Sequence, residues 1–132
     1  MNKELRIMEN RKIENFKDLE ARKKGQAFVL NIYQVTKQFP KEEQFGLIAQ
    51  LRRAGVSITS NIAEGFSRRS YREKSQFYAI ALGSLTEVQS QLLSARDIGY
   101  LDPDINNALD SAGVEIHKII NGLIKSSFIL YS

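Results

Sequence analysis

Apolar residues recur at intervals of three and four along almost the whole of this 132-residue chain, which contains only two prolines. Such spacing places the apolar side chains on one face of an α-helix, whereas a half-buried strand would alternate at every second position. The pattern is clearest between residues 78 and 95, at Tyr78, Ala81, Leu85, Val88, Leu92 and Ala95. The spacing therefore predicts an all-α protein.

The pattern divides the chain into four expected helices, at about residues 18–38, 41–65, 70–99 and from 102 to the C-terminus. The links between them are only a few residues long, which favours antiparallel neighbours, and the spacing of three and four is typical of helices that cross at a shallow angle. We expect a single-domain, up-down-up-down antiparallel four-helix bundle over residues 16–132. A charged tail, residues 1–15, precedes it.

Three of the expected helix boundaries carry residues that are typical of helix ends or starts. Gly65 is suited to the position just past the end of the second helix. Ser70 and Glu73 match the capping box that begins many helices. Asp102 and Pro103 place an acid at the cap and a proline at the first position of the fourth helix.

Each expected helix has one stripe of apolar residues that faces the centre of the bundle, which we call its seam. The helices contain more apolar residues than these seams require. Natural surfaces avoid large exposed apolar patches, so we expect these residues to be covered by other subunits of a homo-oligomer. The alternative is that each helix buries a broad face within one subunit. The surplus residues are Phe45, Leu47, Val56, Phe66, Phe77, Ile80, Leu82, Ile120, Phe128, Ile129 and Tyr131.

Charge is distributed unevenly along the chain, whose net charge is +4. Residues 1–74 contain 16 basic and nine acidic side chains, whereas residues 75–132 contain three basic and six acidic ones. This imbalance predicts that an anionic partner, such as a nucleic acid, would meet the first half. Alternatively, the two halves could neutralise each other across an intramolecular or intersubunit contact.

The basic residues form two clusters that are candidates for nucleic-acid binding. The first cluster consists of Arg68, Arg69, Arg72 and Lys74 and follows the expected end of the second helix. There the N-terminus of the third helix and the guanidinium groups would both favour phosphate, although a solvated charged turn is the alternative. The second cluster, Arg52 and Arg53, lies within the second helix.

A polar stripe runs along the otherwise apolar second helix. It consists of Arg53, Ser57, Ser60, Asn61 and Glu64, several of which are four residues apart. A buried polar stripe destabilises a protein unless its groups find partners. It is therefore exposed, satisfied within an interface or hydrogen-bonded network, or a ligand surface that could belong to an enzyme.

Other features argue against catalysis. The chain has no cysteine and a single histidine, His117, two positions after Glu115. Residues two apart on a helix point to different faces, so these two do not form the Glu-x-x-His pair of di-iron bundles. No phosphate-binding or nucleophile motif occurs. We expect no enzymatic activity, no metal and no cofactor.

Nothing in the sequence indicates a membrane protein. There is no apolar run of about 18 residues, and the first fifteen residues are charged throughout, unlike a secretory signal. A cytoplasmic location is the default expectation.

A long motif links the chain to a known family. It consists of the segments Phe16–Leu19, Phe39–Leu47, Gln50–Ala54, Ser57–Gly65, Arg68–Ser70, Ile80–Glu87, Leu92–Leu101 and Asn121–Ile124. In these segments the sequence resembles the bacterial four-helix bundle proteins first noticed as products of intervening sequences in 23S ribosomal RNA genes. The resemblance covers about residues 16–126, and Thr59 stands where this family usually has proline, so we expect a straighter second helix than the family norm.

The resemblance implies a homo-oligomeric bundle assembled as a ring of five subunits. The family has no established enzymatic activity. A distantly related group serves as accessory factors of diversity-generating retroelements, where a basic pentamer associates with a reverse transcriptase and nucleic acid. The leading hypothesis is therefore a non-enzymatic, oligomeric protein that binds RNA or DNA through its basic clusters. The alternative is a protein–protein scaffold whose partner is a polymerase such as a reverse transcriptase.

Overall fold

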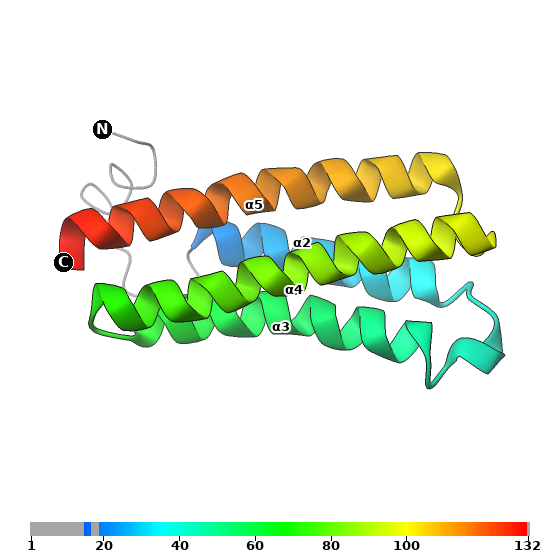
Figure 1. The fold of residues 1–132 in the computed structure, drawn as a ribbon, viewed down its shortest axis with the longest axis horizontal. Helices are drawn as coiled ribbons and strands as arrows, with labels where there is room; N and C mark the ends of the chain where they lie inside the picture. Colours follow the sequence, from blue (N-terminus) through cyan, green and yellow to red (C-terminus); the bar gives the residue numbers. More distant parts are fainter. Residues whose placement is uncertain (1–14, 17–18, 132) are drawn as a thin grey trace.

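The structure, a computed structural model, describes residues 15–16 and 19–131. Within these residues it contains four long α-helices and no strand, so the expected all-α fold is confirmed (Figure 1). The expected charged tail lies, apart from residue 15, outside the described residues. The helices are α2 (Glu20–Thr36), α3 (Leu47–Ser67), α4 (Tyr71–Ile98) and α5 (Pro103–Tyr131), and a short 3₁₀ turn, η2 (Lys41–Glu43), precedes α3.

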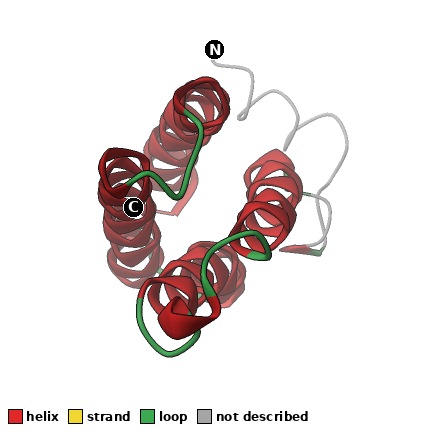
Figure 2. Ribbon diagram, turned by 90° about the vertical axis from the view of Figure 1, so that its right-hand side faces the viewer, coloured by secondary structure: helices red, strands yellow, loops and turns green. Residues whose placement is uncertain are grey.

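The chain reverses direction at each connection, so that α5 begins beside the end of α4 and returns along the bundle (Figure 1). Seen end-on, the four helices surround a common centre, and a wider gap separates the ribbons of α2 and α5 than those of α3 and α4 (Figure 2). Lys24 of α2 and Glu115 of α5 form an ion pair between the two more widely spaced helices.

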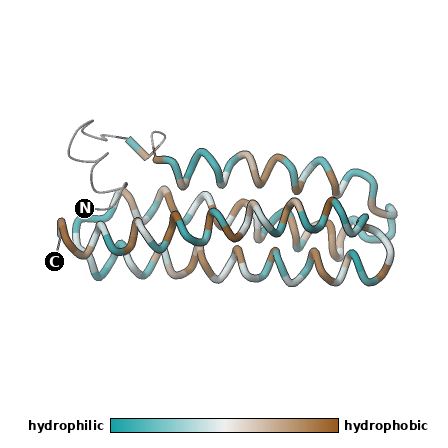
Figure 3. Tube along the Cα trace, turned by 90° about the horizontal axis from the view of Figure 1, so that it is seen from above, coloured by the Kyte–Doolittle hydropathy of each residue, from teal (hydrophilic) through white to brown (hydrophobic). Residues whose placement is uncertain are grey.

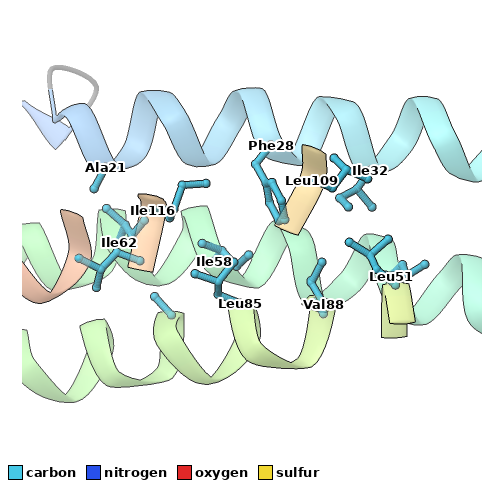
Figure 4. Close-up of a cluster of buried hydrophobic side chains, with 14 of the residues drawn as sticks. Ala21, Phe28, Ile32, Leu51, Ile58, Ile62, Leu85, Val88, Leu109 and Ile116 are labelled. Carbon is cyan, nitrogen blue, oxygen red and sulfur yellow. The ribbon is translucent and has the colours of Figure 1, made fainter. Parts of the chain in front are cut away.

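The core is one cluster of apolar side chains to which every helix contributes. Apolar and polar residues alternate along each helix with the period of a helical turn, as Figure 3 shows, and the apolar ones meet in the centre (Figure 4). The seam predicted for α4, from Tyr78 to Ala95, is buried along its whole length. Burial of these side chains is the main force that holds the helices together.

Two of the predicted helix starts are confirmed in atomic detail. The Ser70 hydroxyl oxygen accepts a hydrogen bond from the main-chain N–H of Glu73 at 3.2 Å. The Asp102 carboxylate accepts one from the N–H of Asp104 at 2.8 Å. At the end of α4, Gly99 has a φ of 101°, a left-handed conformation that favours glycine.

The predicted bounds of the second helix are wrong at both ends. It was expected over residues 41–65, but Lys41–Glu43 form only a 3₁₀ turn and α3 begins at Leu47. Gly65 does not end the helix, which continues to Ser67. A Cβ atom at Gly65 would lie 2.6 Å from Cε1 of Tyr78, so this glycine permits the close approach of α3 and α4.

Candidate nucleic-acid interface

The turn between α3 and α4 presents Arg68, Arg69 and Arg72, which we call the arginine cluster. All three are exposed. The guanidinium group of Arg68 donates to the Glu64 carboxylate at 3.1 Å and lies over the Phe77 ring, 4.7 Å from its centroid. Arg68 is therefore held in a defined orientation, with its positive charge partly compensated by one acid.

The other two arginines of the cluster have free guanidinium groups. Neither Arg69 nor Arg72 has a hydrogen-bonded or ionic side-chain partner within residues 15–16 and 19–131. Arg68 and Arg69 line an open hollow of about 490 Å³ together with Ser67, Ser70 and Glu73. A guanidinium group in such a place is available to phosphate or carboxylate oxygens from another molecule.

Lys74, the fourth candidate of this cluster in the sequence, is not part of the exposed surface. Only 3% of its area is exposed. Its ammonium group lies 2.8 Å from the carbonyl oxygen of Phe66 and 3.4 Å from that of Gly65, at the end of α3. The rings of Phe66 and Tyr131 flank it, and burial lowers its pKa. Lys74 therefore has a structural role.

The second basic cluster is separate from the first. Arg52 lies in α3, 16 residues before Arg68, which caps the end of that helix, so the two are about 24 Å apart along the axis. Its guanidinium group donates to the Thr36 hydroxyl at 3.0 Å and stacks on the Tyr33 ring of α2 at 4.6 Å. Arg52 therefore connects α2 and α3, and of these two arginines only Arg53 is exposed.

The polar stripe divides into a half-buried part and an exposed part. The Ser84 hydroxyl of α4 donates to the Ser57 hydroxyl of α3 at 2.8 Å, and the Asn61 amide reaches the same oxygen at 3.0 Å. Ser60, Glu64 and Arg53 face solvent. Ser57 and Asn61 thus form a small network at the α3–α4 interface, while the exposed members do not converge with them on one pocket.

The balance of charge differs between the two ends of the bundle. Because the chain reverses direction at each turn, each half of the sequence reaches both ends (Figure 1). The arginine cluster lies at the end where α5 finishes, since Tyr71 contacts Phe128 there with ring centroids 5.1 Å apart. At the other end, the rings of Phe39 and Tyr100 are 5.7 Å apart. That end presents five acids and three cations, which are Glu42, Glu43, Asp97, Asp102 and Asp104, and Lys37, Lys41 and Arg96.

The surplus apolar residues have three different fates. Ile120 is completely buried and belongs to the core, which corrects its assignment to an oligomer contact. Leu47, Phe66 and Leu82 are partly buried against the core. The remaining exposed ones include Phe45, whose area is 90% exposed. Others with large exposed fractions are Val56, Ile80, Phe128, Ile129 and Tyr131.

His117 lies beside Asn121, with 3.0 Å between its Nδ1 atom and the amide nitrogen. In the part of the chain that the structure describes, no three His, Cys, Asp or Glu side chains are grouped so that they could hold a metal ion. Nor does any helix there have the length and apolar character needed to cross a bilayer.

The Tyr71–Phe128 contact was not anticipated from the sequence. Each residue had a visible signal, Tyr71 among the arginines and Phe128 outside the fourth seam. Their proximity depends on where α5 ends relative to α4, which no local pattern specifies.

Comparisons with known proteins identify the family. The family model of the 23S rRNA-intervening sequence protein matches residues 17–122. A solved structure of a protein of unknown function from the S23 ribosomal protein family of Bacteroides thetaiotaomicron is similar, with a TM-score of 0.73. It is 23% identical and covers 80% of this chain and 95% of its own, a likeness that shows the shared fold. No curated protein matches.

The matched segment contains α2, α3, α4 and most of α5, and therefore the arginine cluster and the polar stripe. Since this match extends over most of the chain and agrees with the observed bundle, the protein belongs to the 23S rRNA-intervening sequence protein family.

Proposed function

We propose that this protein is a non-enzymatic, homo-oligomeric protein that binds the phosphates of RNA or DNA through the arginine cluster. The observation behind the proposal is that Arg69 and Arg72 are exposed and have no ionic partner among the described residues. Guanidinium groups match phosphate oxygens in geometry, and water-exposed cations close together attract a polyanion.

The position of the cluster supports the proposal. It occupies the end of the bundle opposite a set of turn residues in which acids outnumber cations, so a polyanion would be attracted more strongly to the arginine end. In an oligomer the cluster would be repeated, and weak contacts would add through multivalency.

The test is a fluorescence-anisotropy titration with labelled duplex RNA at several salt concentrations. Each phosphate contact contributes about −0.9 to the slope of log affinity against log salt for duplex DNA. The double variant Arg69→Ala/Arg72→Ala should bind more weakly, with a slope shallower by about two for each bound subunit. The control variant Lys37→Ala/Lys41→Ala removes the same number of positive charges at the opposite end of the bundle. It should bind the RNA more tightly than Arg69→Ala/Arg72→Ala does.

If both double variants lose affinity equally, binding depends on net charge and the arginine cluster is not the site. If the wild-type chain does not bind at low salt, the proposal is wrong.

The homo-oligomer is part of the same proposal. It is supported by exposed apolar side chains on several helices, which a lone subunit would leave in water. The family resemblance favours a ring of five. Light scattering coupled to size-exclusion chromatography should give about five times the 15.0 kDa subunit mass. A mass of 15.0 kDa at micromolar concentration would exclude the ring.

A protein–protein scaffold is the second candidate, and Phe45 favours it. Its ring is 90% exposed next to Glu42 and Glu43, at the acidic end. A partner with a basic surface and an apolar pocket, such as a polymerase, would match this end. Capture of a protein that survives nuclease treatment and is lost with Phe45→Ala would support the scaffold.

A further inference from the structure

We propose that a second hollow beside the arginine cluster binds an unpaired guanine base, and that the Glu64 carboxylate accepts the hydrogen bonds of that base. This inference rests on the proposed function, and it adds a base preference and the residue that determines it.

The second hollow, which we call the Glu64 hollow, has a volume of about 380 Å³ and lies beside the last turns of α3. Its walls combine apolar atoms with a few polar groups, as is typical of sites for small ligands, and its volume lies within their usual range. The lining residues are Phe16, Ser60, Ala63, Glu64 and Ser67.

The Glu64 hollow adjoins the hollow of the arginine cluster. Ser67 lines both of them, while Glu64 lines one and Arg68 lines the other. The hydrogen bond of 3.1 Å from Nη2 of Arg68 to Oε2 of Glu64 joins the two hollows. Only a sugar separates the phosphate of a nucleotide from its base, so a phosphate held by the arginine cluster would bring its base beside Glu64.

The Glu64 carboxylate can accept further hydrogen bonds. Its Oε2 atom accepts from Arg68, and its Oε1 atom has no hydrogen-bond partner within residues 15–16 and 19–131. Each carboxylate oxygen has two lone pairs for donors. The side chain is 53% exposed, so another molecule can reach it. Arg68 therefore fixes the orientation of the carboxylate and leaves most of its acceptor capacity unused.

Among the RNA bases, guanine matches a carboxylate best. Its Watson–Crick edge carries two adjacent donors, the N1–H and the N2 amino group, which can meet the two oxygens. Adenine and cytosine have one amino group with an acceptor beside it, and uracil has one N–H between two carbonyl oxygens. Because base pairing covers this edge in a duplex, the bound guanine must be unpaired.

The charge of Glu64 makes the site selective. A carboxylate close to bound phosphates repels them, and so it lowers the affinity for every nucleotide unless it makes a compensating contact. Guanine makes that contact and the other bases do not. Removal of the charge should therefore weaken the binding of guanine relative to adenine without weakening the binding of adenine itself.

Two 12-nucleotide RNAs, (UUG)₄ and (UUA)₄, test the base preference. They have the same length, charge and number of purines, and differ only in the purine base. In fluorescence-anisotropy titrations the wild-type protein should bind (UUG)₄ at least about fivefold more tightly than (UUA)₄, which is the lower limit of discrimination by a bidentate contact.

Glu64→Gln tests the carboxylate, because it keeps the shape of the side chain and an oxygen that can accept from Arg68. Its affinities for the two RNAs should lie within about twofold of each other, since the amide has only one oxygen. It should bind (UUA)₄ no more weakly than wild type does. The matched control Glu73→Gln removes the same charge from the arginine hollow and should keep the preference for (UUG)₄. Thermal unfolding followed by circular dichroism establishes that both variants are folded.

The outcomes separate the two proposals. If wild type binds (UUG)₄ and (UUA)₄ equally, the guanine site is wrong and the arginine site stands. If Glu64→Gln weakens both RNAs by the same factor, Glu64 only orients Arg68, and the guanine site is again wrong. Loss of the preference in Glu73→Gln would also overturn its assignment to Glu64. If wild type binds neither RNA, both proposals are wrong.

Discussion

The Lys74 ammonium donates a hydrogen bond of 2.8 Å to the carbonyl oxygen of Phe66, and so joins the first turn of α4 to the last turn of α3. The last carbonyl groups of a helix have no partner within the helix. Here one buried cation serves the carbonyls of both Gly65 and Phe66, under the rings of Phe66 and Tyr131. The contact fixes the turn that presents the arginine cluster.

Lys74→Met should therefore destabilise the protein. The substitution keeps most of the side-chain volume but leaves the Phe66 carbonyl without its Lys74 donor, at a cost of about 1–3 kcal/mol, whereas the Gly65 carbonyl still accepts from the main-chain N–H of Arg68. Lys125→Met, at an exposed position of α5, is the matched control and should change the free energy of unfolding by less than about 0.5 kcal/mol. Urea unfolding of both variants measures the difference. Equal stabilities would contradict the structural role of Lys74.

The stability contributed by Lys74 should also depend on pH. Burial lowers its pKa in the native state below the ordinary 10.5. Between the lowered native pKa and 10.5, the unfolded chain binds more protons at this site than the native chain, so the free energy of unfolding rises with pH. The difference between wild type and Lys74→Met should accordingly increase from neutral pH toward 10.5, because other groups titrate alike in both chains. A difference that falls over this range would show that the native pKa is raised instead.

Two glycines in neighbouring helices should respond in opposite ways to alanine. At Gly65 the new methyl group would lie 2.6 Å from the buried Tyr78 ring, so the helices must separate or the ring must move, at a cost of about 1–3 kcal/mol. At Gly83 no atom lies within 4 Å, and alanine should stabilise α4 by up to about 1 kcal/mol. Thermal or urea unfolding of Gly65→Ala and Gly83→Ala gives the comparison. If both changes stabilise the protein, the close approach of α3 to Tyr78 is wrong.

Gly65 also illustrates which parts of the fold could be predicted. The seams and the caps at Ser70 and Asp102 were readable from the sequence, because spacing and capping are local properties. A glycine near the end of a helical pattern has two explanations, a left-handed end or a close approach to another helix. Only the position of Tyr78 in α4 decides between them, and that depends on the packing of two helices.

The candidate site was only partly predictable for a related reason. The arginine residues are visible as a cluster in the sequence, but Lys74 lies four positions before Tyr78 and so continues the buried seam of α4. That spacing was a signal for burial, and the neighbouring charges concealed it. The partners of Lys74 come from α3 and α5, so its role follows from tertiary contacts that no local pattern contains.

The Ser57–Ser84 hydrogen bond across α3 and α4 is testable by a double-mutant cycle. Ser57→Ala removes the oxygen that accepts from both Ser84 and Asn61, and should cost about 0.5–1.5 kcal/mol. Ser84→Ala should cost a similar amount, and the double variant less than the two together, since the second change removes a contact already lost.

Because alanine favours helices slightly more than serine does, the exposed Ser60→Ala measures that gain separately. Urea unfolding of the four chains gives the coupling energy. A coupling of zero would mean that the hydroxyl groups do not stabilise the interface, and the half-buried part of the polar stripe would then again be a candidate ligand surface. A positive coupling assigns Ser57 and Ser84 to the stability of the bundle, because the hydrogen bond between them exists only when α3 and α4 are packed together.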